Sequence, residues 1–252
     1  MSVPSITRPQ RRGPGDPAND GAIPPLENGD RLTRDEFERR YHAMPGLKKA
    51  ELIEGEVYMP SPVRQRFHGR PHSHLNHWLT SYEAETPGVE VGDNSTVRLD
   101  SENEPQPDCL LFIQPEHGGQ TRIGSDGYIE GAPDLVAEIA ASSASVDLGR
   151  KLEVYRRNGV REYLVWRVRD RELDWYVNHG EGFHRLEPEA DGTLRSEIFP
   201  GLRLDPGALL RGDVNGVLAA LRGGLETPGH AEFVARLARE VPPAAEGPIK
   251  GG

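Results

Sequence analysis

Two short apolar runs in this chain each carry a carboxylate, and this pattern constrains the fold more than any other sequence feature. The stretch "QPDCLLFI" places Asp108 directly before an apolar run, and "PDLVAEIA" places Glu138 inside the next one. Runs of this length and composition predict strands buried in a sheet. Because the side chains of a strand point to alternate faces, we expect Asp108 to share a face with Leu110 and Phe112. A glutamate in a central strand must pair with another group or bind a cation to offset its lost hydration.

Each carboxylate alone has an ordinary structural explanation. Asp108 follows Pro107 and could be a turn residue, and Glu138 could form a buried salt bridge with an arginine. Two carboxylates on neighbouring strands, however, supply the hard oxygen ligands that Mg²⁺ or Mn²⁺ prefers, with water and a phosphate oxygen completing the coordination. Such an ion lowers the pKa of a bound water and neutralises charge on a phosphate under attack. The pair therefore favours a divalent-metal site that acts on phosphate groups.

Length and composition are those of an ordinary globular protein. A chain of 252 residues can bury one sizeable core, and 35% of its residues are hydrophobic. No run approaches the roughly 18 apolar residues of a membrane helix, so no membrane association is expected. The single cysteine, Cys109, excludes an internal disulfide and favours a cytoplasmic location. The formal net charge of -10 argues against nonspecific attraction to nucleic acid over the whole surface, but it leaves room for a local basic stripe.

One folded domain is predicted between two tails. Residues 1–28 and 241–252 are rich in proline, glycine and polar groups without periodicity, so we expect them to be disordered. Residues 29–240 alternate between helix and strand patterns. The order is a helix, a hairpin, a second helix, three strands, a third helix, a strand meander and C-terminal helices. This order predicts an α/β or α+β domain with a mixed β-sheet flanked by helices.

Local signals place several of these elements. Thr33 and Glu36 have the spacing of a capping box, which predicts a helix within 32–46. Pro71 has no amide proton and belongs in the first turn of the next helix, which places His68 at or just before its start. A third helix is predicted over 143–159, where Leu148, Lys151, Leu152 and Tyr155 share one face.

The separate segments, taken in order, resemble the PD-(D/E)XK nuclease superfamily. More closely, the chain from about residue 32 to residue 215 is similar to the bacterial putative restriction endonuclease family of the Uma type. The matching stretches are "ELIEGEVYMPSP", "HGRPHSHLNHWL", "PQPDCLLFI", "GYIEGAPDLVAEIAASSASVDLGRKLEVYRRNGVREYLVWRV" and "FPGLRLDP". The resemblance implies a restriction-endonuclease-like core and hydrolysis of DNA phosphodiester bonds that depends on Mg²⁺ or Mn²⁺.

The resemblance also assigns roles to individual residues. Asp108 matches the motif aspartate and Glu138 the motif glutamate, so both would bind the metal and act in catalysis. Ala140 stands where the motif lysine belongs, and Lys151 in the following helix matches the lysine that the family carries instead. Lys151 would polarise the attacking water or bind phosphate. Its alternative is an ion pair with Asp147, four residues earlier, on a solvated helix face.

Three further residues are candidates for the same site. His68, at the start of the second helix, would be an additional metal ligand by resemblance to related nucleases. Glu51, in the hairpin, is interpreted as a support for the sheet or a further ligand, and Asp147 as a group that orients Lys151. The nearby histidines at 72, 74 and 77 could instead suggest zinc, but no cysteine or fixed ligand spacing accompanies them.

Two classes of function follow from these residues. The first is an active endonuclease with DNA as its partner, and by analogy such an enzyme could form a homodimer. The second is a catalytically weak or inactive module that uses the nuclease scaffold to bind nucleic acid or a partner protein. The absent strand lysine at Ala140, the stretch "AASSAS" and the negative net charge favour the second.

Overall fold

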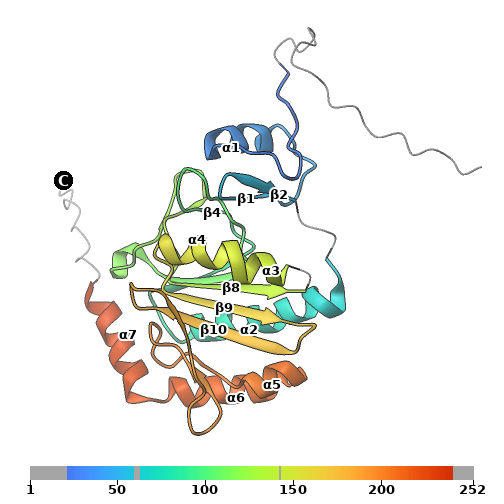
Figure 1. Cartoon of the computed structure of the whole chain (residues 1–252). Helices are drawn as coiled ribbons and strands as arrows, with labels where there is room; N and C mark the ends of the chain where they lie inside the picture. Colours follow the sequence, from blue (N-terminus) through green and yellow to red (C-terminus); the bar gives the residue numbers. More distant parts are fainter. Residues whose placement is uncertain (1–21, 60–62, 142, 241–252) are drawn as a thin grey trace, which may run out of the picture.

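A six-stranded mixed sheet forms the centre of the protein (Figure 1). The structure is a computed structural model, and it describes residues 22–59, 63–141 and 143–240. The strand order is β11-β10-β9-β8-β5-β3. The strands are β3 (Val89–Asp93), β5 (Cys109–Ile113), β8 (Leu135–Ala140), β9 (Glu162–Arg167), β10 (Glu172–Asn178) and β11 (Phe183–Arg185). In this sheet β8 and β9 run parallel and all other neighbouring strands are antiparallel, so the prediction of a mixed sheet is confirmed.

Helices cover both faces of this sheet. One face packs against α2 (Arg70–Ala84), α5 (Pro206–Arg211), α6 (Val214–Leu225) and α7 (Pro228–Glu240). The other face is covered by one continuous helical stretch made of α3 (Ala144–Val146), a π-helical turn η3 (Asp147–Lys151) and α4 (Leu152–Arg157). Alternate residues of the strands divide between the two cores: Leu111 and Ala137 face α2, whereas Leu110 and Val136 face α4. This alternation decides which side chains can reach the candidate site.

The N-terminal part forms a smaller layer beside the sheet. Helix α1 (Arg34–His42) packs on the hairpin of β1 (Glu51–Ile53) and β2 (Glu56–Tyr58), around Phe37 and Leu52. The hairpin turns at Glu54 and Gly55, which both have positive φ, as a tight two-residue turn requires. The remaining elements are β4 (Val97–Arg98), β6 (Arg122–Ile123), β7 (Ile129–Glu130), β12 (Leu194–Arg195), β13 (Arg203–Leu204), a π-helical turn η1 (Gln65–Gly69) and a 3-10 turn η2 (Pro115–His117).

Most predicted elements are confirmed, with two local differences. The capping box at α1 does not form, because the Thr33 side chain makes no cap hydrogen bond and Glu36 binds Arg39 and Arg40 instead. The N-terminal tail was predicted through residue 28, yet Leu26 is buried in the cluster around Phe37. The rest of the predicted tails, residues 1–21 and 241–252, lie outside the described residues.

Within the residues that the structure describes, every helix is too short or too polar to span a lipid bilayer.

Candidate functional site

Asp108 and Glu138 face each other across adjacent strands. The antiparallel register of β5 and β8 pairs Cys109 with Ala137 and Leu110 with Val136. Continuing it by one residue places Asp108, which directly precedes β5, opposite Glu138. Both carboxylates therefore point to the face of the sheet that α4 covers.

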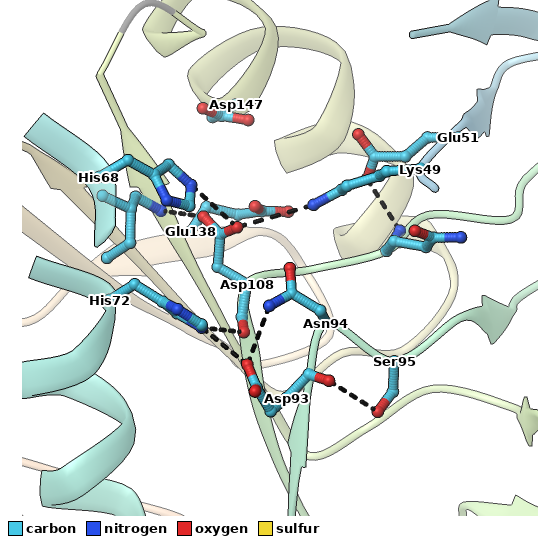
Figure 2. Close-up of polar contacts among 12 residues, drawn as sticks. Lys49, Glu51, His68, His72, Asp93, Asn94, Ser95, Asp108, Glu138 and Asp147 are labelled. Atoms are coloured by element: carbon cyan, nitrogen blue, oxygen red, sulfur yellow. Dashed lines mark hydrogen bonds and ion pairs between the residues drawn. The ribbon is translucent and has the colours of Figure 1, made fainter. Parts of the chain in front are cut away.

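The Asp108 carboxylate is held in a charged state by three neighbouring groups (Figure 2). Its Oδ1 accepts a hydrogen bond from Nε2 of His68 at 3.1 Å and lies 3.7 Å from Nζ of Lys49. Its Oδ2 accepts the backbone N–H of Ile139 at 2.7 Å. Burial alone would raise the pKa of Asp108, but the His68 hydrogen bond and the Lys49 charge lower it to about 2. Asp108 is therefore an anion throughout the physiological pH range.

Residues of α2 and the turn before it support Asp108 from one side. His68 lies in η1, directly before α2, as the position of Pro71 predicted. One turn later, Nε2 of His72 lies 2.9 Å from the backbone oxygen of Asp108 and 2.8 Å from Oδ1 of Asp93. His72 thus ties the Asp108 backbone to the end of β3 (Figure 2).

Glu138 is bound by two residues of the covering helix. Its Oε1 accepts hydrogen bonds from Nζ of Lys151 at 2.9 Å and from the Tyr155 hydroxyl at 3.0 Å. Burial, together with the nearby charges of Asp108 and Asp147, raises the pKa of Glu138 to about 8, although the Lys151 charge opposes this. The partner of this strand carboxylate is therefore a lysine, and the alternative of an arginine salt bridge is wrong.

Lys151 is enclosed among three carboxylates. Its Nζ lies 2.8 Å from Oε1 of Glu51, 2.9 Å from Oε1 of Glu138 and 3.9 Å from Oδ1 of Asp147. Burial would lower the pKa of Lys151, but the surrounding carboxylates raise it well above its usual value. The alternative of an ion pair on a solvated helix face is therefore wrong: Lys151 and Asp147 approach one another, but both are buried.

Glu51 and Asp147 complete the surroundings of Lys151. Oε1 of Glu51 also accepts the backbone N–H of Gln106 at 2.8 Å, so this carboxylate joins the N-terminal hairpin to the segment before β5. Among the described residues, Oδ2 of Asp147 is a buried oxygen without a hydrogen-bond partner. An unpaired buried carboxylate oxygen is costly, and a cation is one group that can satisfy it.

The donor set suits a hard divalent ion in chemistry and in charge. The four carboxyl groups of Glu51, Asp108, Glu138 and Asp147 lie around the two ammonium groups of Lys49 and Lys151. In the part of the chain that the structure describes, no three His, Cys, Asp or Glu side chains are placed as a ready metal cage. Mg²⁺ does not require such a cage, because it keeps several waters and commonly uses one or two carboxylates plus substrate phosphate.

The sequence did not predict three contacts of this site, those made by Lys49, His72 and Tyr155. Lys49 stands two residues before Glu51, so strand alternation predicts that both point the same way. Tyr155 stands four residues after Lys151 on the predicted helical stripe, which identified its face but not its hydroxyl contact. For the backbone contact of His72 the sequence carries no signal.

Comparisons with known proteins agree with this architecture. The model of the Uma2 family, described as "Putative restriction endonuclease", matches residues 34–207. The structure is similar to the crystal structure of a putative nuclease belonging to DUF820 from Anabaena variabilis, with a TM-score of 0.55 and 17% sequence identity. The match covers 71% of this chain and 98% of that chain. It confirms the predicted fold class. No curated protein matches the sequence.

Proposed function

This chain belongs to the Uma2 family of putative restriction endonucleases, and from that premise we propose that it is a metal-dependent endonuclease that hydrolyses DNA phosphodiester bonds. The observation that carries the proposal is the pair Asp108 and Glu138, which the β5–β8 register places opposite each other on one face of the sheet. The hydrogen bond from Ile139 to Asp108 fixes this arrangement at the start of β5.

Asp108 and Glu138 would hold the metal, Mg²⁺ or Mn²⁺. When bound, such an ion acidifies a water molecule and neutralises charge that develops on the phosphate. The raised pKa of Glu138 supports this assignment, because burial and the neighbouring carboxylates of Asp108 and Asp147 disfavour its negative charge, and a bound cation would offset both effects. His68 donates to Asp108, so it orients this carboxylate, and a direct metal contact would require that hydrogen bond to be given up.

The two lysines would have separate tasks. Lys151 stays protonated between Glu51 and Glu138, so it cannot accept a proton from water; its role is to position Glu138 and to supply positive charge. Lys49 is more accessible, with 24% of its side chain exposed, and lies beside Asp108. Lys49 is therefore the better placed of the two to contact a bound phosphate.

A basic surface next to His68 would accommodate the DNA backbone. Arg64, Arg66 and Arg70 are exposed on and around η1. The guanidinium of Arg169 lies 4.9 Å from the ring centroid of Phe67, which brings another cation to the same turn. Other arginines of the chain, such as Arg167, bind acidic neighbours and are less suited to phosphate. This local distribution is how a chain of net charge -10 could still bind DNA.

Plasmid cleavage tests the proposal directly. Supercoiled plasmid is incubated with the wild-type protein and Mg²⁺ or Mn²⁺, and nicked and linear products are measured on gels. Glu138→Ala and Asp108→Ala should abolish cleavage. Asp174→Asn is a matched control, because Asp174 is also a buried carboxylate but lies on β10 and binds Arg167 and Arg185. Circular dichroism of each variant shows whether it is folded.

Calorimetric titration with Mn²⁺ separates metal binding from catalysis. The wild type and Asp174→Asn should bind Mn²⁺, whereas Asp108→Ala should not. Cleavage that persists in folded Glu138→Ala would mean a contaminating nuclease or a different site. Absence of both cleavage and Mn²⁺ uptake in the wild type would contradict the proposal.

One observation favours a second candidate, a nuclease-fold module that binds nucleic acid or a partner protein without cleaving. Both strand carboxylates already have lysine partners: Asp108 lies beside Lys49, and Glu138 is bonded to Lys151. If these ion pairs replace the metal permanently, the protein would bind DNA without Mn²⁺ uptake. Filter binding of DNA in EDTA, combined with the calorimetry, distinguishes the two candidates.

The cytoplasmic location belongs to the same proposal and rests on the single cysteine of the chain, Cys109, which is a free thiol. A homodimer remains a prediction, which sedimentation of the protein with and without DNA would test.

A further inference from the structure

A pocket of about 350 Å³ opens beside the candidate site. It lies between the end of α1, the loop that follows α1, and the residues preceding β4, β5 and β7. Its lining includes the side chains of Tyr41, His42 and Tyr128. The Tyr128 hydroxyl is hydrogen-bonded to Nε2 of His42 at 3.3 Å. The guanidinium carbon of Arg98 lies over the Tyr128 ring, 4.4 Å from the ring centroid. These contacts hold the Tyr128 ring in one orientation.

Three lining residues connect the pocket to the carboxylate pair. Lys48 directly precedes Lys49, whose Nζ lies near Asp108. The backbone N–H of Asn94 donates to the backbone oxygen of Asp108 at 3.2 Å. The backbone N–H of Gln106 donates to Glu51, the carboxylate that binds Lys151. The pocket is thus built from the immediate neighbours of the groups proposed to bind phosphate and metal.

The pocket combines aromatic rings with neutral hydrogen-bonding groups. The buried Gln106 amide donates from Nε2 to the Tyr41 hydroxyl at 3.3 Å and to Oγ1 of Thr96 at 3.0 Å. Asn94, which is exposed, also lines the pocket. Rings offer stacking surfaces, and amides and hydroxyls can bind donors and acceptors on the edge of a flat ligand. A nucleobase is the ligand that presents both features next to a phosphate.

We propose that this pocket binds a single unstacked nucleobase of the DNA strand whose phosphate lies at Asp108 and Glu138. The inference rests on the proposed function and adds a substrate class to it: DNA with an unpaired nucleotide at the cleavage position. In an intact duplex the bases are stacked inside the helix, so a base must leave the helix to enter a protein pocket. That displacement costs least where the base is mismatched or already unpaired. The pocket therefore favours bubbles, mismatches and single strands over fully paired DNA.

A fluorescent base in DNA reports on this pocket without requiring cleavage. One strand carries 2-aminopurine either within a small bubble or at the same position of a fully paired duplex. Binding is measured in EDTA from the fluorescence change and from anisotropy. The wild type should bind the bubble about tenfold or more tightly than the paired duplex, and stacking on Tyr128 should quench 2-aminopurine in the bubble only.

Variants identify the pocket as the origin of the preference. Tyr128→Ala should weaken bubble binding about tenfold while changing paired-duplex binding by less than about twofold. Tyr128→Phe retains the ring and should behave like the wild type. Tyr176→Ala is the matched control, because Tyr176 is also half-buried but lies on β10, separated from β8 by β9. If Tyr128→Ala fails to fold, His42→Ala, an exposed residue of the pocket, replaces it.

The outcomes separate this inference from the proposed function. If plasmid cleavage depends on Glu138 but the wild type binds bubble and paired DNA equally, the pocket inference is refuted and the nuclease stands. An equal loss of affinity for both DNA forms in Tyr128→Ala would also refute it. If the wild type binds neither DNA form and cleaves none, both proposals are wrong.

Discussion

Removal of the buried ammonium at Lys151 should be among the most destabilising single changes at this site. Lys151→Met keeps a side chain of similar length but deletes the charge that lies 2.8 Å from Glu51 and 2.9 Å from Glu138. All three groups are buried, so water cannot replace the lost partner. Removing one partner of a buried ion pair typically costs about 3–5 kcal/mol, because the remaining charge is left uncompensated.

The pKa of Glu138 limits this cost. Because burial already raises it to about 8, this carboxyl can remain protonated near neutral pH instead of staying charged and unpaired. We therefore expect the lower end of the range, about 3 kcal/mol in the free energy of unfolding. The double variant Lys151→Met/Glu138→Gln lacks one of the two carboxylates that lose their ammonium partner. Its loss in the free energy of unfolding should therefore be smaller than the sum of the losses of the two single variants, with a coupling energy of about 1–3 kcal/mol.

Urea unfolding followed by tryptophan fluorescence measures these values. The expected loss for Lys151→Met corresponds to a midpoint about 1 M lower in urea. Arg156→Met is the matched control, because Arg156 belongs to the same helical stretch and its contact with Glu153 is as short, at 2.6 Å, but is open to solvent, with 33% and 48% of the two side chains exposed. An exposed ion pair contributes less than about 1 kcal/mol. Equal effects of Lys151→Met and Arg156→Met, or strictly additive effects in the double variant, would refute the reasoning that burial makes Lys151 essential.

Three further predictions concern the stability of the scaffold. Burial raises the pKa of Glu162 from 4.5 to about 7, although the Ser196 hydroxyl opposes this. The folded state thus holds the Glu162 proton more tightly than the unfolded chain does. The resulting contribution to the free energy of unfolding is fully present below about pH 4.5 and is lost as the pH rises through 7. Glu162→Gln should remove up to about 3 kcal/mol of this pH dependence in urea unfolding, and an unchanged pH profile would contradict the assignment. Asp213→Ala deletes the side-chain cap of α6 and should cost about 1 kcal/mol in thermal unfolding; an unchanged melting temperature would contradict this role of the cap. Gly224→Ala would place a Cβ 2.1 Å from the backbone oxygen of Gly201 and should cost about 1–3 kcal/mol; a neutral result would contradict this close approach of the two backbone segments.

Local pattern was sufficient to predict the elements that carry the site. The alternation of apolar side chains in β5 and β8 predicted that Asp108 shares a face with Leu110, and the helical spacing of Leu148, Lys151 and Tyr155 predicted that these side chains share one face of a helix. Such predictions succeed because strand and helix periodicities relate residues a few positions apart. The same is true of His68, whose place before α2 follows from the position of Pro71.

Tertiary structure decided which of these side chains meet. Glu51 and Lys151 are 100 positions apart, and no periodicity relates a hairpin residue to a helix residue at that distance. The contacts of Lys49 with Asp108 and of His72 with Asp93 arise in the same way. Whether Lys151 faces water or carboxylates was therefore open in the sequence and was decided by how the N-terminal hairpin packs.

The sequence by itself determined the order of the elements, the face of each strand and the identity of the acidic pair, because these depend on short-range backbone geometry. The burial of Lys151, the charged state of Asp108 and the pocket at Tyr128 depend on the tertiary structure alone. They are produced by segments distant in the chain that pack together, and only packing sets the distance between charges and their exclusion from water.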